Sequence, residues 1–232
     1  MISETYNTDC LEAMRQMPDK AFDLAICDVP YGIGEDGSKN HSRRRMAVSR
    51  DYKPFSGNDL EPPSAEYFEQ LFRVSRNQII FGANHFISRL PFDSPCWFVW
   101  DKENGATDFA DCELAWTSFQ TAVRKFKFRW QGMLQEDMKN KEERIHPTQK
   151  PVAVYRFLLR TYAKAGDTIL DTHLGSGSSR IAAYDLGFDF TAFELDADYF
   201  NAQEKRFADH IAQPKLFMPT PQPMIQEAMQ FA

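Results

Sequence analysis

Short runs of apolar residues, bounded by polar and turn-forming residues, recur along the chain. The clearest runs lie at 22–27, 78–81, 96–100, 113–116, 168–171 and 190–194. Runs of this length, rich in Ile, Leu, Val and Phe, are typical of strands buried on both faces. They predict a sheet whose strands lie in the core, because a half-exposed strand would alternate apolar and polar residues.

Apolar residues spaced by three and four positions predict helices between these strands. Ser64 caps a predicted helix at 65–76, and Asp196 caps one of about 15 residues that ends near Ile211. Another helix is expected at 152–163, with Thr148 or Gln149 near its start and Pro151 in its first turn, and a fourth at 179–186. Strands that alternate with helices predict an α/β fold, with a mostly parallel sheet and helices on both faces.

The length of 232 residues suits one substantial α/β domain with insertions. We expect this domain to cover residues 1–212. Two segments near 32–58 and 101–145 are interpreted as inserted DNA-recognition segments: the first shows no sustained hydrophobic period, and the second is irregular from 117 to 145, after the predicted strand at 113–116. Residues 213–232 contain four prolines and few charges, which predicts an extended C-terminal tail.

The net charge of −6 argues against a protein that binds nucleic acid through its whole surface. Positive charge is nevertheless clustered inside the two insertions, where it could contact phosphate or guanine edges. The candidate DNA-binding residues are Lys39, Arg43, Arg44, Arg45, Arg50 and Lys53 in the first insertion, and Arg124, Lys125, Lys127 and Arg129 in the second. A local basic face is therefore the expectation.

Cysteine and histidine spacing signals no metal site and no disulfide framework. The four cysteines form no CxxC pair and the five histidines are scattered. The first residues lack a basic segment followed by an apolar one, and no run approaches the roughly 18 apolar residues of a membrane helix. We expect no metal, no membrane partner and a reducing, cytoplasmic setting.

A glycine turn follows the predicted strand at 168–171. Gly175 and Gly177 lie between this strand and a helix, and Glu194 ends the next strand nineteen residues after Gly175. Such glycines let the backbone approach a ligand, and an acidic residue at the next strand end suits ribose hydroxyls. The third glycine of a dinucleotide fingerprint is missing, and no pyrophosphate clamp is evident. The turn therefore favours S-adenosyl-L-methionine over NAD.

Asp28-Val29-Pro30-Tyr31 follows the first strand, at the end where open α/β sheets bind ligands. The exocyclic amino group of adenine or cytosine is a poor nucleophile because its lone pair is delocalised into the ring. Acceptors on Asp28 and on the Val29 carbonyl would take its two hydrogens and aim that lone pair at a methyl group. Pro30 would stiffen the turn, and Tyr31 would stack on a base flipped out of the duplex.

The order of these motifs resembles the β group of amino DNA methyltransferases, with phage and prophage members closest, over residues 7 to about 207. The resemblance rests on four segments: Asp28 to Tyr31, His146 to Pro151, Asp171 to Gly177, and Glu194 with Asp196, Tyr199 and Phe200. Segments 80–86 and 97–102 are also similar to those enzymes. The resemblance implies a Rossmann-like methyltransferase fold with a circularly permuted motif order, because the glycine turn comes late.

The resemblance also implies roles for individual residues and partners. Asp28, Val29, Pro30 and Tyr31 would form the catalytic target-amine site. Lys150 would be a partner for the cofactor carboxylate as the segment around it closes. The implied cofactor-binding residues are Asp9, Cys10, Asp28, Phe81, Asn84, Lys150, Asp171, His173, Gly175, Ser176, Gly177, Ser178 and Glu194. Double-stranded DNA is the implied substrate, and a homodimer is one expectation, since dimers are common in this group.

Some residues depart from the family pattern. Val29 stands where a second proline is usual, so the turn loses stiffness while the carbonyl is kept. Thr172, His173 and Ser178 replace Pro, Phe and Thr in the glycine turn. Asp at position 28 favours adenine N6 as the target. Cytosine N4 stays an alternative, as does a catalytically weakened relative that only binds DNA.

Three other classes of enzyme share parts of this pattern. A cytosine C5 methyltransferase needs a cysteine nucleophile, but Cys96 opens an apolar strand, and the glycine turn comes first in that class. Protein-glutamine and RNA methyltransferases also place the glycine turn first. An NAD dehydrogenase would leave the segment from Asp28 to Tyr31 without a role. The motif order therefore favours an amino DNA methyltransferase.

Overall fold

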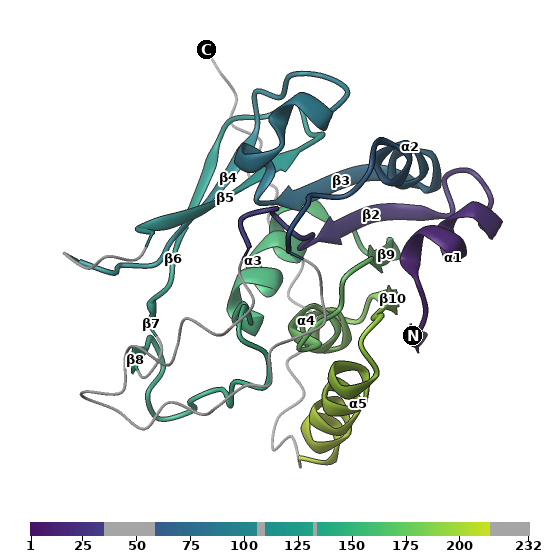
Figure 1. Cartoon of the computed structure of the whole chain (residues 1–232). Coiled ribbons are helices and arrows are strands. Elements are labelled where there is room, and N and C mark those ends of the chain that lie inside the picture. Colours follow the sequence, from purple (N-terminus) through teal and green to yellow (C-terminus); the bar gives the residue numbers. More distant parts are fainter. Residues whose placement is uncertain (35–58, 106–109, 132–133, 214–232) are drawn as a thin grey trace.

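The computed structural model describes residues 1–34, 59–105, 110–131 and 134–213. Most strands in this part of the chain form one eight-stranded sheet (Figure 1). Its strands are β1 (Ser3–Tyr6), β2 (Phe22–Cys27), β3 (Ser75–Phe81), β4 (Trp97–Asp101), β5 (Cys112–Thr117), β6 (Arg124–Lys127), β9 (Thr168–Asp171) and β10 (Asp189–Phe193). Two short strands, β7 (Trp130–Gln131) and β8 (Leu134–Gln135), pair separately.

Within the described residues, five α-helices accompany the sheet: α1 (Cys10–Gln16), α2 (Ala65–Val74), α3 (Val152–Tyr162), α4 (Ser178–Leu186) and α5 (Ala197–Ala212). Two 3-10 turns, η2 (Ala83–His85) and η3 (Ile87–Arg89), follow β3. None of the described helices is long and apolar enough to cross a membrane.

The strand order is β1-β10-β9-β2-β3-β5-β4-β6. Neighbouring strands are parallel except around β5, which is antiparallel to both β3 and β4. From the centre the chain moves outward in both directions, from β9 to β10 on one side and from β2 to β3 on the other. The border between β9 and β2 is therefore a switch point, where open α/β sheets bind their ligands. The predicted mostly parallel α/β sheet is confirmed.

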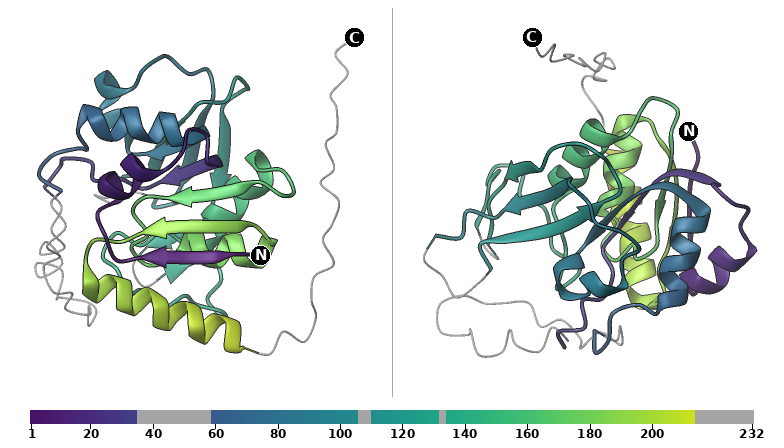
Figure 2. Two further views of the ribbon diagram at one scale, coloured as in Figure 1. Left: turned by 90° about the vertical axis from the view of Figure 1, so that its right-hand side faces the viewer. Right: turned by 90° about the horizontal axis from the view of Figure 1, so that it is seen from above.

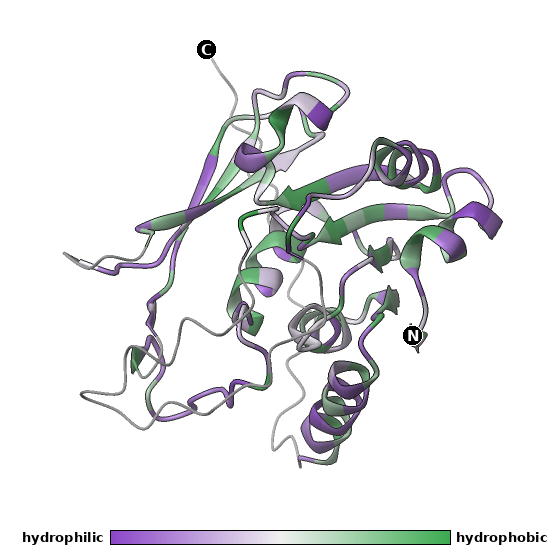
Figure 3. Ribbon diagram, in the orientation of Figure 1, coloured by the Kyte–Doolittle hydropathy of each residue, from purple (hydrophilic) through white to green (hydrophobic). Residues whose placement is uncertain are grey.

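Helices cover both faces of the sheet, and each face has its own apolar core (Figure 2). One core joins α1 and α2 to the sheet through residues such as Met14, Leu71 and Ile80. The other joins α3 and α4 to the opposite face through residues such as Leu158 and Ile181. Figure 3 shows hydrophobic residues along much of β2, β9 and β10 and at the end of β3, as expected for strands covered on both faces.

The predicted helix starts agree with the structure, whereas some boundaries move. Ser64 and Asp196 cap α2 and α5 as predicted. The helix expected at 65–76 ends at Val74, because the backbone of Ser75 is extended and begins β3. Pro151 lies at the N-cap of α3, one position before the predicted first turn.

The N-terminal region and the second insertion contain elements that the hydrophobic pattern did not predict. β1 and α1 precede the first predicted strand, and β6 lies inside the segment interpreted as irregular. These elements are short and amphipathic or polar, so their apolar periodicity is weak. Most of the first insertion, residues 35–58, and the tail from 214 lie outside the described residues.

Candidate active site

The site lies where β2 and β9 end side by side. Leu24 pairs with Ile169 and Ala25 with Leu170 in parallel register, so both strands reach the same edge of the sheet. Asp28 follows β2, and Asp171 is the last residue of β9. The fold therefore brings together two motifs that are far apart in the sequence.

Asp28 is held by two neighbours at this edge. One carboxylate oxygen lies 2.5 Å from the Lys150 ammonium, and the other accepts a 2.9 Å hydrogen bond from the Tyr31 hydroxyl. The Lys150 ammonium also donates to the Tyr31 hydroxyl over 3.1 Å. Burial raises the pKa of Asp28, although Lys150 opposes this shift. Asp28 is thus a partly buried acceptor whose charge depends on its partners.

Glu113 is a second carboxylate in the same cluster. One of its oxygens lies 3.0 Å from the Lys150 ammonium, and the other pairs with Lys102. Burial alone would raise the pKa of Glu113, but the two lysines lower it to about 2. Burial also disfavours the charged Lys150, yet Asp28 and Glu113 raise its pKa above the ordinary value. The four side chains form a compensated set of two anions and two cations.

The ring of Tyr31 lies directly against the backbone of Gly82. A Cβ atom at Gly82 would stand 2.1 Å from the Tyr31 ring, and the φ of Gly82 is +69°. His85 stacks on Tyr31 with ring centroids 5.5 Å apart and an interplanar angle of 16°. The Asp59 carboxylate accepts hydrogen bonds from the backbone amides of Tyr31 and Gly32. These contacts hold the ring and the backbone of Tyr31 in place, in a turn that has Val29 where a second proline is usual.

Asp171 has only neutral partners. It accepts hydrogen bonds from the Ser179 hydroxyl and from the His173 amide, and it is 1% exposed. Burial raises its pKa to about 7, with a further contribution from the Asp28 charge. A carboxyl group without a cation nearby is expected to behave in this way.

The glycine turn connects β9 to α4 and is tied to β10. The Gly175 amide donates to Glu194 over 2.8 Å, and the Asp196 amide donates to the other oxygen of Glu194 over 2.9 Å. Gly175 and Gly177 both have positive φ, which favours glycine. The Glu194 carboxylate is therefore oriented by the turn, at the end of the neighbouring strand.

Arg206 on α5 supports the turn from behind. Its guanidinium donates to the Ser176 carbonyl, to the Ser178 hydroxyl and to the Glu142 carboxylate. Glu142 in turn accepts from the Val152 amide at the start of α3. The glycine turn and the segment that carries Lys150 are thereby joined through one ion pair.

His173 lines the other side of the glycine turn. Its Nδ1 lies 2.9 Å from the Thr172 hydroxyl, and its ring makes an edge contact with Tyr67. Burial lowers the pKa of His173 to about 4, so the ring is neutral near pH 7. Asp9, exposed at the N-cap of α1, opposes that shift, which places Asp9 in the same electrostatic environment. Half-buried Cys10 follows Asp9, and burial raises its pKa.

The His146 to Pro151 segment lies across both strand ends. A Cβ atom at Gly175 would come within 3.9 Å of the His146 ring, and His146 contacts Tyr199. Gln149 is 4% exposed, and its side chain bonds the backbone of Ile145 and Glu143. Its own carbonyl accepts from the Trp130 indole. Gln149 thus braces the loop, while Lys150 reaches Asp28.

The remaining predicted residues divide into three groups. Phe81 is buried, and its ring centroid lies 4.6 Å from the Lys150 ammonium, whereas Asn84 is exposed on η2. Arg124, Lys125, Lys127 and Arg129 lie exposed on or just after β6, at the sheet border. The six basic residues of the first insertion, Lys39, Arg43, Arg44, Arg45, Arg50 and Lys53, lie outside the described part of the chain.

The basic strand β6 ends at the same edge as Asp28. Lys127 pairs in register with Asp101, and the neighbouring Trp100 pairs with Glu113. Since β4 and β6 are parallel, Lys127 and Arg129 extend past the edge on which Glu113 lies. Lys125 and Lys127 each have an acidic neighbour at 3.5 Å and stay more than half exposed. Lys125 and Lys127 are therefore placed to contact a ligand that extends beyond the site around Asp28.

Sequence reasoning missed several members of this site. Glu113, Lys102, Asp59 and Arg206 received no role, although Glu113 began a predicted strand. Its position became informative only once β5 proved antiparallel, because that direction puts the start of β5 beside the end of β3. A charged residue at a strand boundary was the one available signal.

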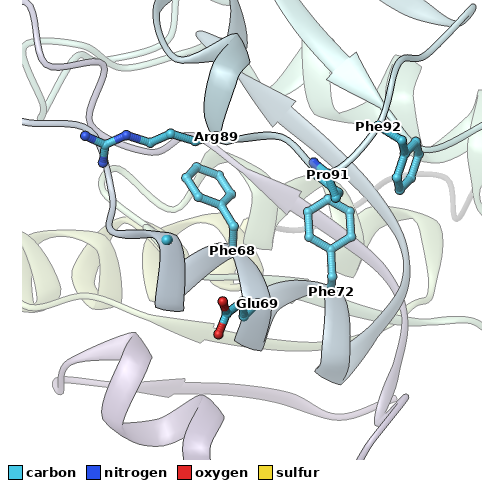
Figure 4. Close-up of a pocket in the computed structure, with 7 residues that line it drawn as sticks. Phe68, Glu69, Phe72, Arg89, Pro91 and Phe92 are labelled. Atoms are coloured by element: carbon cyan, nitrogen blue, oxygen red, sulfur yellow. The ribbon is translucent and has the colours of Figure 1, made fainter.

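A separate hollow of about 310 Å³ lies between α2 and the segment at the end of η3 (Figure 4). Phe68, Phe72 and Phe92 line it, with Glu69 and Arg89 at its border. None of the predicted site residues contributes to it. Within the described ranges, no group of three or more His, Cys, Asp or Glu residues could hold a metal ion.

Comparison with known proteins links this site to one family. The family model described as "DNA methylase" matches residues 97–205. The type II methyltransferase M2.DpnII from Streptococcus pneumoniae is 31% identical over 239 residues, which cover 86% of this chain and 87% of the relative.

Two solved structures share the fold. The complex of M1.HpyAVI with SAM has a TM-score of 0.53 at 19% identity and covers 89% of this chain and 100% of the other. The cytosine-N4-specific PvuII DNA methyltransferase has a TM-score of 0.58 at 13% identity, with coverages of 88% and 85%. The predicted Rossmann-like fold is confirmed, including the late position of the glycine turn in the chain.

Proposed function

This chain belongs to the N6/N4 DNA methylase family, and from that premise we propose that it transfers a methyl group from S-adenosyl-L-methionine to N6 of adenine in double-stranded DNA. The family prediction made from the motif order is thereby confirmed. The main support for the proposal is the meeting of Asp28 and the glycine turn at the switch point of the sheet. We assign the reaction to one domain spanning residues 1–212.

The residues around the glycine turn suit a nucleoside cofactor. The Glu194 carboxylate, oriented by the amides of Gly175 and Asp196, would accept from ribose hydroxyls. Asp9, Cys10 and His173 would flank the adenine end, and the neutral His173 ring adds a planar surface. Asp171, Ser176, Gly177 and Ser178 shape the turn itself. S-adenosyl-L-methionine, when bound, supplies a methyl group on a positively charged sulfur.

The residues after β2 would hold the target amino group. Asp28 and the Val29 carbonyl accept its two N–H hydrogens, which turns the nitrogen lone pair toward the methyl carbon. The N–C bond forms as the S–C bond breaks, and the sulfur keeps the electron pair. The nitrogen then loses one proton to Asp28 or to solvent. Tyr31, backed by Gly82 and His85, would stack on the flipped base.

Adenine is the preferred target because a carboxylate stands at position 28, where cytosine N4 enzymes tend to carry serine. The fold alone does not separate the two bases, since the cytosine-N4-specific PvuII enzyme shares it. The exposed basic residues of β6 would contact DNA phosphates beside the site. Cytosine N4 is therefore the alternative that an assay must distinguish.

The decisive experiment incubates the protein with labelled cofactor and unmethylated double-stranded DNA, digests the DNA, and identifies the labelled nucleoside. We expect label in N6-methyl-2′-deoxyadenosine. Label in N4-methylcytosine would keep the enzyme class and overturn the target base. Label in 5-methylcytosine, or cofactor binding with no transfer, would overturn the proposed function.

A further inference from the structure

Both oxygens of the Asp28 carboxylate are engaged by other side chains. Lys150 lies 2.5 Å from one oxygen, and Tyr31 donates to the other. A target amino group must find an acceptor on the same carboxylate. The amino nitrogen also gains positive charge as the methyl group arrives, and an ammonium beside it would oppose that charge. Lys150 must therefore release Asp28 before transfer.

Lys150 cannot release Asp28 by moving into water. Its side chain is 3% exposed, and its ammonium is enclosed by the rings of Phe81, at 4.6 Å, and Tyr31, at 5.6 Å. A buried ammonium without an anion is costly. Another carboxylate must therefore pair with the Lys150 ammonium when the amino group displaces Lys150 from Asp28.

Glu113 is placed for that purpose. Its nearer oxygen is 3.0 Å from the Lys150 ammonium, so only a small movement of Lys150 is needed. The Lys102 ammonium holds the other oxygen and keeps the carboxylate in position. Asp28 follows β2, Glu113 lies on β5, which runs in the opposite direction, and the two carboxylates share one lysine.

We propose that Glu113 is a positioning residue that retains the Lys150 ammonium while the target amino group replaces it on Asp28. This inference rests on the proposed amino-group methylation and adds a residue to it. Glu113 acts through Lys150 and does not touch the base. Without Glu113, Lys150 would stay on Asp28 and compete with the amino group.

A double-mutant cycle between Glu113→Gln and Lys150→Met tests the inference. The readout is the single-turnover rate of methyl transfer, which registers even very slow variants, together with the cofactor Kd from calorimetry. Glu113→Gln alone should lower the transfer rate by about 10-fold or more and change the cofactor Kd by less than about 2-fold. In the Lys150→Met background the same change should cost less than about 2-fold, since no ammonium remains to be retained.

Equal losses in both backgrounds would overturn the inference, because a purely structural role does not depend on Lys150. Glu113→Asp covers the case in which the glutamine variant does not fold. This variant keeps the negative charge but moves the carboxylate away from Lys150 by the length of one methylene group. An unchanged transfer rate would therefore also overturn the inference. Glu66→Gln removes the same unit of charge from an exposed pair with Arg15 and should match the unaltered enzyme.

The inference and the proposed function fail in different ways. No methylated nucleoside from the unaltered enzyme would reject the function itself. Normal methylation by both the unaltered enzyme and the Glu113→Gln variant would reject the inference and leave the function standing.

Discussion

The two strand ends that form the site hold their buried carboxylates in opposite ways. After β2, Asp28 lies within a cluster of charged side chains that contains Lys150, Glu113 and Lys102. At the end of β9, Asp171 has a hydroxyl and a backbone amide as its partners. The two ends are neighbours, yet the cations of the cluster lower the pKa of Glu113 on β5 to about 2, whereas the pKa of Asp171 is raised to about 7.

The difference follows from the partners and not from burial alone. Burial raises the pKa of all three carboxyl groups; Lys150 opposes this shift at Asp28 without reversing it, whereas Lys150 and Lys102 together reverse it at Glu113. The Lys150 ammonium beside β2 therefore favours the negative form of Asp28, the acceptor for a nitrogen that becomes positive. The β9 end instead orders the glycine turn with neutral donors. The charged side chains beside the β2 end are suited to methyl transfer, whereas the neutral hydrogen bonds at the β9 end fix the shape of the glycine turn.

The largest expected effect comes from removing the charge at the β2 end. Asp28→Asn should lower kcat by about 1,000-fold or more, because the amide weakens both the acceptor and the stabilisation of positive charge. Cofactor Kd should stay within about 2-fold, since the β9 end is unchanged. Labelled methyl transfer and calorimetry measure the two quantities. Asp209→Asn, in an exposed pair with Lys205 on α5, is the control. Turnover near that of the control would show that the amine site is misassigned.

Gly82→Ala should have the next largest effect, because the added Cβ would stand 2.1 Å from the Tyr31 ring. The ring must leave its place, and we expect kcat to fall by about 100-fold. Gly166→Ala is a matched control, since Gly166 also has positive φ but nothing lies within 4 Å of its added Cβ. Both variants should lose similar backbone stability, of about 1 kcal/mol. Equal kcat in the two variants would contradict the packing role of Gly82.

Asp171→Asn should change the pH dependence of stability. The folded pKa of Asp171, about 7, lies above the ordinary value of 3.8, so its contribution to stability is complete below pH 3.8 and is lost as pH rises through 7. Between pH 5 and 8 the unaltered protein should lose about 3 kcal/mol that the variant keeps. Urea unfolding at both pH values measures the difference. Parallel pH curves for the two proteins would place the raised pKa elsewhere.

The smallest expected effect concerns DNA affinity outside both strand ends. Lys127→Ala should raise the Kd for DNA by about 3-fold and lower the slope of log K against log salt by about one unit. Its kcat at saturating DNA should not change, because Lys127 lies on β6 and not among the reacting groups. Binding titrations at several salt concentrations measure both quantities. Lys164→Ala, in the turn that precedes β9, should leave affinity unchanged, and an equal loss there would argue against a DNA face at β6.

Sequence reasoning located Asp28, Asp171 and Glu194 at strand ends because each follows a short apolar run in the chain. It also identified the helix caps Ser64 and Asp196, because capping depends on residues only a few positions away. The motif order also predicted the family and the fold. Strand ends and caps depend on neighbouring residues, and the family depends on the order of the motifs along the chain. Both kinds of feature can be recognised in a single sequence.

The partners of Asp28 could not be found in this way. Lys150 was expected near the cofactor carboxylate, and the structure brings it to Asp28 and Glu113 across the sheet. Glu113 reaches the site because β5 runs antiparallel, and strand direction depends on the connections between elements and not on the residues of the strand. The sequence carries the reacting groups and their order, whereas the charges that surround them depend on tertiary packing, because electrostatic interactions act across space between residues far apart in the chain.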